Sequence, residues 1–507
     1  NGEMVHSYPH SWRSKAPLVH RATPQWFISM DSHKLRSKAL KALDETVFYP
    51  SKGKERLKAM IETRPDWCVS RQRVWGVPLP IFVHKKTKET LVDDWVNENI
   101  ASIYEKEGSD CWFSDDPQKF LGDKYKAEDY EKMSDIVEVW FDSGSTHAFV
   151  LEKRQDLKWP ASMYLEGSDQ HRGWFHSSLL ESCATRGRAP FESILSHGFV
   201  VDGKGLKMSK SVGNVIAPED ILKKYGADIL RIWVASSNYA EDLRIDYSIL
   251  DQHADSYRKI RNTFRYLLGN INDDLEETNL DKVDIKKLPE LEQFMLHKIY
   301  SLDLNFKKYF KNYDFHNLYK ELLNFCTVDL SAFYFDIRKD CLYCDTKDST
   351  KRQSTILLLK IILNALLKWF APILSFTTEE IFKLVGNKKS IHLERFINFP
   401  INFKNDNLNL KWLELIKIRD ICNLSIEEKR SVKIIGSSLE ALLKIKLDKE
   451  KFEIVKDIDL SELCITSSAH VEKTEQNQVL VETEKAKGDK CSVCWKISLQ
   501  PCERHGA

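Results

Sequence analysis

Two lysines that follow a glycine-containing turn are spaced for phosphate chemistry. Residues 196–214 read SHGFVVDGKGLKMSKSVGN, and the apolar run at their start predicts a short strand. The Asp-Gly-Lys-Gly turn after it is flexible, because glycine accepts backbone angles that other residues avoid. Ammonium and hydroxyl groups on such a loop can offset the charge that develops on polyphosphate oxygens, whereas lysine pairs alone also occur in solvated basic turns. The loop residues with this potential role are Lys207, Met208, Ser209, Lys210 and Ser211.

A second group of polar residues lies at the end of an apolar run. Residues 164–179 read YLEGSDQHRGWFHSSL, in which Glu166 and Asp169 enclose Gly167 and Ser168. Folds of the α/β type bind ligands at such strand ends. The apolar spacing after this turn predicts a helix, so the carboxylates would lie at a helix N-terminus. The turn is therefore either a ligand site or a simple helix cap.

The last residues carry a pattern typical of a zinc site. Cys491, Cys494, Cys502 and His505 follow the spacing C-x2-C-x7-C-x2-H, which supplies the four ligands of tetrahedral zinc. Four protein ligands leave no open position, so we expect one structural Zn²⁺ per chain, ordering a unit too small to fold alone. A further C-x2-C pair in residues 341–344 has no second pair nearby, and we expect no metal there.

These groups must be positioned by three kinds of structure. Residues 1–240 alternate short apolar runs with helical patterns, which predicts an α/β fold. Residues 240–400 have helical apolar spacing and few prolines, which predicts a helix bundle. Beyond the polar residues 400–409 we expect a helix around 412–428, then a strand, a turn and a helix over 431–447, and a strand at VLVET before the cysteine unit.

The composition indicates a soluble, cytoplasmic protein but leaves its function open. The chain of 507 residues is 42% hydrophobic and 30% charged, with 76 basic and 75 acidic residues. Its 11 cysteines are mostly solitary, which argues against a secreted disulfide scaffold. The apolar segment 356–374 carries Lys360, Asn364 and Lys368 on one stripe, so we expect a buried bundle helix and no membrane contact. We also expect a monomer.

The sequence resembles the class I aminoacyl-tRNA synthetases, and among them the isoleucyl enzymes. The word KMSKS-x-G-N at 207–214 is the signature loop of the class, and EGSDQH at 166–171 matches the isoleucyl pattern. RPDWCVSRQRVWGVPLP at 64–80 and VWFDSGS at 139–145 agree with it. The resemblance spans the chain and is strongest in residues 1–265. It implies activation of L-isoleucine with ATP and Mg²⁺, followed by transfer to tRNA(Ile).

The resemblance also implies roles for single residues. Lys210 and Lys207 would act in catalysis and bind ATP together with Met208, Ser209 and Ser211. Glu166 would contact the isoleucyl-adenylate, with Gly167, Asp169 and Gln170 beside it. Trp140 and Trp174 match the aromatic residues that wall the isoleucine pocket, although core packing is the commoner role of a tryptophan. Zinc ligands in the family are usually four cysteines, so His505 is a departure.

By this resemblance the chain divides into five segments. They are 1–215, the second half of a Rossmann-like catalytic domain with a connective insertion; 216–250, a stem-contact linker; 251–400, a helical anticodon-binding domain; 401–485, an α+β junction domain; and 486–507, a zinc knuckle. The basic residues Arg258, Lys259, Arg261 and Arg265 would face RNA phosphates, or form a solvated helix face.

Two parts of the resembling enzymes are missing from this sequence, and two rival functions stay open. The sequence contains no His-x-Gly-His motif and no threonine-rich editing domain. We therefore expect the chain to be a C-terminal part that is inactive on its own. The rivals are a synthetase for valine or another branched amino acid, and a tRNA-binding protein without catalytic activity.

Overall fold

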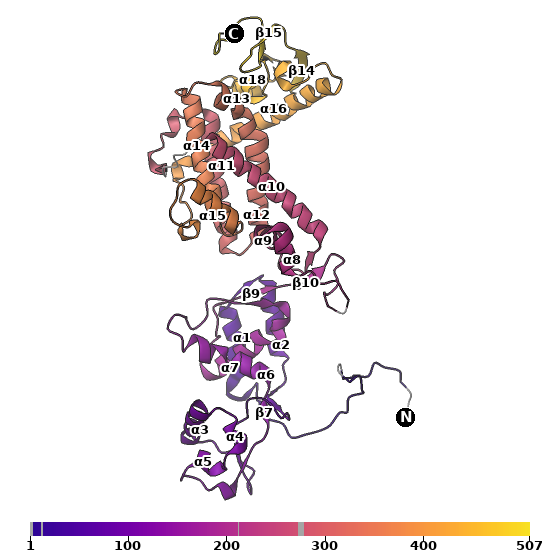
Figure 1. Ribbon diagram of the computed structural model, residues 1–507, viewed down its shortest axis with the longest axis vertical. Coiled ribbons are helices and arrows are strands. Elements are labelled where there is room, and N and C mark those ends of the chain that lie inside the picture. The colour runs from indigo at the N-terminus through magenta and orange to yellow at the C-terminus, as the bar shows by residue number, and fades with distance from the viewer. Residues whose placement is uncertain (1–3, 12–13, 211, 272–277, 507) are drawn as a thin grey trace. The chain divides into compact units, whose positions relative to one another are not determined.

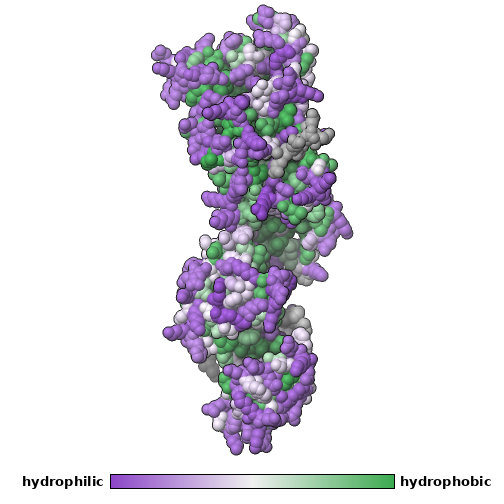
Figure 2. Space-filling model, turned by 90° about the vertical axis from the view of Figure 1, so that its left-hand side faces the viewer, coloured by the Kyte–Doolittle hydropathy of each residue, from purple (hydrophilic) through white to green (hydrophobic). Residues whose placement is uncertain are grey.

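The computed structural model describes residues 4–11, 14–210, 212–271 and 278–506. The chain forms two compact units, Asn1–Phe199 and Val200–Ala507, and each is described by itself (Figure 1). Hydrophilic residues make up most of the face seen in Figure 2.

A three-stranded parallel sheet forms the centre of the first unit. Its order is β2-β9-β8, so the central strand comes last in the chain and its two neighbours pair on either side. The strands are β2 (Val47–Tyr49), β8 (Tyr164–Gly167) and β9 (Ser193–His197). The helices packed around them are α1 (Leu35–Glu45), α2 (Lys52–Glu62) and α7 (Trp174–Thr185).

The core beneath this sheet is built from apolar side chains at helical spacing. In α7, Phe175 and Leu179 are fully buried, and they pack with Ile194 of β9. Parallel strands covered by helices read as short continuous apolar runs, which is why the sequence predicted them. The α/β prediction for this region is confirmed.

A small insertion separates the first and second strands of that sheet. It contains two antiparallel strand pairs and a cluster in which Trp112 packs between Phe82 and Phe120, each with ring centroids 5.0 Å away. The pairs are β4 (Ser70–Arg71) with β7 (Ile136–Val137) and β5 (Phe82–His84) with β6 (Tyr130–Lys132), while β3 (Trp67–Cys68) pairs with β1 (Phe27–Ile28), which precedes β2. The helices are α3 (Asp94–Glu107), α4 (Cys111–Ser114) and α5 (Pro117–Leu121), followed by α6 (Val139–Gly144) and the π-helix η3 (His147–Leu151).

The second unit begins with a parallel strand pair and continues as a helix bundle. Strands β10 (Val200–Asp202) and β11 (Leu243–Ile245) flank the helices α8 (Pro218–Tyr225) and α9 (Ala227–Ser236). The bundle contains α10 (Tyr247–Asn270), α11 (Glu290–Lys311), α12 (Phe315–Asn324), the π-helix η7 (Phe325–Phe335), α13 (Asp336–Cys344), α14 (Thr350–Phe370), α15 (Ser375–Leu384) and α16 (Asp406–Ser431). The predicted bundle is confirmed.

Helix α14 is long and apolar enough to cross a membrane by length and composition, but 67% of its most apolar window is buried inside the protein. Its Lys368 is itself buried and pairs with Glu394 at 3.3 Å. The prediction of a bundle helix at this place is confirmed.

A buried ion pair ties the bundle to the C-terminal region. Arg338 of α13 contacts Glu292 of α11 at 2.6 Å and Glu462 of the short helix α18 (Leu460–Leu463) at 2.7 Å. Tyr334 and Thr355 also donate hydrogen bonds to Glu292. A buried charge of this kind is stable only because each partner is fully hydrogen-bonded. Helix α13 is therefore held firmly at this point.

A mixed three-stranded sheet follows the bundle and corrects one prediction. Its order is β13-β12-β14, with β12 (Ala441–Leu447) parallel to β13 (Ser468–Lys473) and antiparallel to β14 (Leu480–Lys485). Residues 431–447 were predicted as strand, turn and helix, but their end is a strand. Its side chains alternate between buried Leu443 and Ile445 and exposed Lys444 and Lys446, the period of a half-buried strand.

Candidate functional site

The acidic turn lies where β8 ends and α7 begins. Glu166 is the third residue of β8, and Asp169 and Gln170 belong to the 3-10 turn η4 (Ser168–Arg172). Glu166 and Asp169 are exposed, so their carboxylates are free to meet a ligand from solvent. The Gln170 side chain donates a hydrogen bond to Asp169 Oδ2 at 3.2 Å and accepts one from the Trp174 backbone N–H at 2.9 Å. The amide thereby links the turn to the first residue of α7.

The two tryptophans singled out from the sequence lie on either side of Gly173. A Cβ atom on this glycine would lie 2.4 Å from Gln170 Oε1 and 2.8 Å from the Trp140 ring, so only glycine allows the close packing. Trp174 stacks on Tyr164 with ring centroids 3.9 Å apart and donates its indole N–H to the carbonyl of Ser143 at 3.0 Å. These contacts bring Trp140, Gln170 and Trp174 together at the end of β8.

The lysine loop follows β10, in the other compact unit. Lys207 and Lys210 are exposed, while Met208 is partly buried against the cluster formed by α8, α9 and β11. Ser209 accepts a hydrogen bond from the backbone N–H of Val212 at 3.3 Å. Ser211 lies outside the residues that the structure describes. The loop therefore exposes two ammonium groups to solvent, while Met208 anchors it to the rest of the unit.

Two residues that the sequence analysis did not single out brace this loop. Asp202 accepts backbone N–H groups of Lys204 and Leu206 at 3.0 and 2.8 Å, and the Asn214 amide at 2.8 Å. The hydrogen bond from Asn214 lowers the pKa of Asp202 further than any other contact. The Asn214 side chain also accepts the backbone N–H of Ser209 at 2.9 Å. In the sequence, the Asp-Gly turn and the Asn that ends the motif were the features that could have indicated this bracing.

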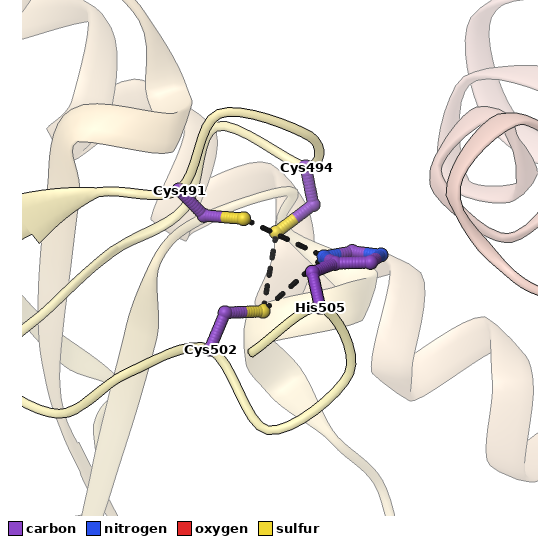
Figure 3. A group of neighbouring side chains, drawn as sticks. All are labelled: Cys491, Cys494, Cys502 and His505. Carbon is purple, nitrogen blue, oxygen red and sulfur yellow. Dashed lines mark hydrogen bonds between the residues drawn. The ribbon is translucent and has the colours of Figure 1, made fainter. Parts of the chain in front are cut away.

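The four residues of the C-terminal pattern converge around one point (Figure 3). Their ligand atoms all lie within 4.8 Å of one another. Sγ atoms of Cys494 and Cys502 are 3.8 Å apart, and His505 Nδ1 lies 3.5 and 3.3 Å from Sγ of Cys491 and Cys502. Zinc bonded to sulfur at about 2.3 Å and to nitrogen at about 2.0 Å requires edges of about 3.8 and 3.5 Å. The donor set and its spacing fit zinc.

The histidine is oriented for coordination through a single ring nitrogen. His505 Nε2 lies 3.0 Å from the carbonyl oxygen of Cys344, so Nε2 carries the proton and donates to it. The lone pair is thereby left on Nδ1, the atom that faces the sulfurs. A histidine that binds a metal usually donates its other N–H group to a carbonyl or carboxylate in this way. Backbone N–H groups of Cys494 and Val493 lower the pKa of Cys491 to about 6, which favours the thiolate.

Helix α13 holds the cysteine unit from outside. Arg504 contacts Asp340 at 2.7 Å and Asp345 at 2.8 Å, next to the hydrogen bond of His505 to Cys344. The hairpin β15 (Asp489–Lys490) and β16 (Ile497–Ser498) supplies the first two cysteines between its strands. Cys341 and Cys344 belong to no metal-ligand group among the described residues.

The basic residues of α10 are all exposed. One of them, Arg258, forms an ion pair with Asp255 one turn earlier. This arrangement is compatible with a solvated helix face and with phosphate contacts alike.

Comparison with known proteins decides the family. The profile described as "tRNA synthetases class I (I, L, M and V)" matches residues 13–246, and "Anticodon-binding domain of tRNA ligase" matches residues 292–447. The chain belongs to the class I tRNA synthetase family. The lysine loop and the acidic turn both lie within the first match, and the second runs from α11 through the end of β12.

Sequence relatives of this synthetase chain are isoleucine–tRNA ligases. The chain is 78% identical to that of Pelagibacter ubique over 100% of its own length and 56% of the relative's. It is 47% identical to those of Brucella abortus and Caldicellulosiruptor bescii, over 98% of this chain and 52% and 55% of theirs. The chain thus spans about half the length of the curated relatives it matches.

Solved synthetase structures share the fold. The chain resembles Mycobacterium tuberculosis methionyl-tRNA synthetase with methionyl-adenylate, at a TM-score of 0.53 and 15% identity, over 76% of this chain and 67% of the other. A second structure of that enzyme gives a TM-score of 0.51 over 77% of this chain and 73% of the other. The fold-class prediction is confirmed at this level.

Proposed function

We propose that this chain is part of an isoleucine–tRNA ligase, which activates L-isoleucine with ATP and Mg²⁺ and transfers it to tRNA(Ile). The observation that carries the proposal is the 78% identity to an isoleucine–tRNA ligase over the whole chain. The intact lysine loop favours an enzyme over a tRNA-binding protein, because RNA binding alone needs no exposed lysine pair on a braced turn. We also propose that the protein is cytoplasmic and monomeric.

Each candidate site has a proposed ligand. Lys207 and Lys210, with Met208, Ser209 and Ser211, bind the phosphates of ATP, and the two ammonium groups offset the charge that builds up during adenylate formation. Glu166, Gly167, Asp169 and Gln170 bind the isoleucyl-adenylate. Trp140 and Trp174 supply apolar walls for the isoleucine side chain. The five segments with boundaries at 215, 250, 400 and 485 divide these tasks as the resemblance implies.

We propose that the C-terminal site binds one structural Zn²⁺ through Cys491, Cys494, Cys502 and His505. The matching donor spacing and the orientation of His505 by the Cys344 carbonyl support it. With four protein ligands, the metal has no open position for chemistry and acts by ordering residues 489–506.

The decisive experiment measures isoleucine-dependent ATP–pyrophosphate exchange in a full-length ligase that carries this sequence. Lys210→Ala should reduce the exchange rate about 100-fold, because the phosphate charge loses a dedicated ammonium group. Affinity for tRNA(Ile) should stay unchanged. Lys204→Ala is the matched control, since Lys204 is an exposed lysine of the same turn, and it should retain exchange activity.

Three results would contradict the proposal: exchange that responds to valine and not to isoleucine, equal losses in the two lysine variants, or full exchange by Lys210→Ala. We expect the present chain by itself to show no exchange, and exchange by the purified chain would overturn that expectation.

A further inference from the structure

A cavity of about 430 Å³ opens in the first unit, between α6 and η3 on one side and the end of α7 on the other. Most of its wall is apolar and comes from Ile28, Trp67, Phe141 and Leu180. Trp140 and Trp174, the residues proposed for the isoleucine side chain, do not line it. The cavity is therefore separate from that pocket.

Two buried polar atoms of the lining have no hydrogen-bond partner among the described residues. They are Oε1 of Glu181, whose residue is 7% exposed, and Nε2 of His147, whose residue is 1% exposed. His147 Nδ1 lies 3.0 Å from the carbonyl of Gly144, so Nδ1 is the donor and Nε2 carries the lone pair. An unpaired buried polar atom destabilises the folded protein, because it has lost its hydrogen bonds to water. A ligand that donates hydrogen bonds would remove that cost.

The charges around Glu181 favour a cationic donor. Burial, followed by the nearby carboxyl groups of Asp142 and Glu138, raises the pKa of Glu181 to about 9. Glu138 is already engaged, by Arg71 at 3.0 Å and by the Trp67 indole at 2.6 Å. The one guanidinium in the lining, Arg186, is engaged by Glu152 at 2.9 Å. Burial lowers the pKa of His147 and the same guanidinium lowers it further, while the apolar walls from β1, α1 and β3 add no charge.

We propose that this cavity binds a primary alkylammonium ion, with its N–H groups on Glu181 and His147 and its alkyl chain against the apolar wall. An ammonium group has three donors, enough for both acceptors. Trp67 and Phe141 supply aromatic contact for the adjoining carbons. Binding requires the Glu181 carboxylate, so the proton held by the free carboxyl leaves to solvent. This site is independent of the aminoacylation proposed above.

Calorimetric titration of the full chain with n-pentylammonium chloride tests the proposal, with n-pentanol as the uncharged analogue. The ammonium ion should bind more tightly than the alcohol at pH 8.5. Its affinity should rise about tenfold or more between pH 6.5 and 8.5, because Glu181 must lose its proton. Titrations in buffers of different ionisation enthalpy should show release of nearly one proton per bound ion.

Glu181→Gln should abolish the proton release and most of the ammonium affinity, whereas Glu55→Gln, an exposed carboxylate of α2, should change neither. Ala148→Leu adds volume inside the cavity and should weaken both ligands. Equal affinity for pentanol, absence of proton release, or ammonium binding that survives Glu181→Gln would overturn the proposal. The wild-type titrations decide it even where a variant fails to fold.

Discussion

Buried ionisable side chains in the first unit determine how its stability responds to pH. Glu181 has a pKa of about 9 in the folded chain against an ordinary value of 4.5, mainly through burial. Between these values the folded state keeps a proton that the unfolded state has lost, so stability falls as pH rises. His147 and His176 have pKa values below the ordinary value of 6.5, so their ionisation affects the stability of the fold only at lower pH. These histidines therefore contribute little between pH 7 and 9, and a Glu181 variant separates the effect of this carboxyl from that of buried thiols such as Cys183, whose pKa is raised to about 12.

We expect Glu181→Gln to flatten the loss of stability between pH 7 and 9. One such carboxyl accounts for up to about 1.4 kcal/mol per pH unit. Thermal denaturation of the wild-type chain and the variant at pH 7, 8 and 9 measures the effect, with Glu55→Gln as control. Parallel pH profiles for all three proteins would show that Glu181 ionises normally in the folded state.

At the level of elements, local patterns were predictable and distant pairings were not. The spacing of Cys491, Cys494, Cys502 and His505 predicted that these four side chains cluster, because a short turn joins the two members of each close pair. The contact that orients His505 comes from Cys344, 161 residues earlier, and no local pattern reveals it. The lysine loop was predicted from its motif, whereas the bracing by Asp202 and Asn214 required the structure.

Strand β12 shows how a local pattern can also give a wrong prediction. The letters ALLKIKL place leucines at helical spacing as well as in alternation, and the helix was chosen. Pairing with β13 and β14 decides for the strand, and these partners lie 26 or more residues further along the chain. Backbone hydrogen bonding to such partners overrides a weak local preference.

The docking of the cysteine unit on α13 gives a prediction at this scale. Arg504→Ala removes the contacts with Asp340 and Asp345 but keeps all four proposed zinc ligands. Zinc affinity should fall about tenfold or more, because partners outside the ligand set hold the ligands in place. Competition with a chromophoric chelator measures the affinity.

Arg430→Ala is the control for that measurement, since Arg430 is a surface arginine paired with Glu427 on α16. Unchanged zinc affinity in Arg504→Ala would mean that the cysteine unit binds metal without help from α13.

On the scale of the whole chain, the apolar core is divided between two units. The described core residues around Leu179 all precede residue 200, and those around Leu366 all follow it. Units that share little core unfold with separate transitions. The first match to the synthetase family nevertheless runs from residue 13 to 246 and crosses this boundary.

Core truncations should therefore act on one unit at a time. Leu179→Ala and Leu366→Ala each remove a fully buried side chain and should destabilise their own unit by about 2–5 kcal/mol. Urea unfolding followed by hydrogen exchange and mass spectrometry resolves the two units. Each variant should shift the midpoint of its own unit alone, and a shift of both midpoints by either variant would show that the units unfold together.

The order of strands in the C-terminal sheet constrains how the protein is made. Strand β12 is synthesised first but occupies the middle, and its hydrogen-bonding partners end at residues 473 and 485. While the ribosome is still translating those codons, both edges of β12 are open to any other extended chain. Helix α16 is made before β12 and belongs to the same apolar cluster as the buried side chains Leu443 and Leu447. Ribosome pausing between these codons would prolong that exposure and favour aggregation of the nascent chain.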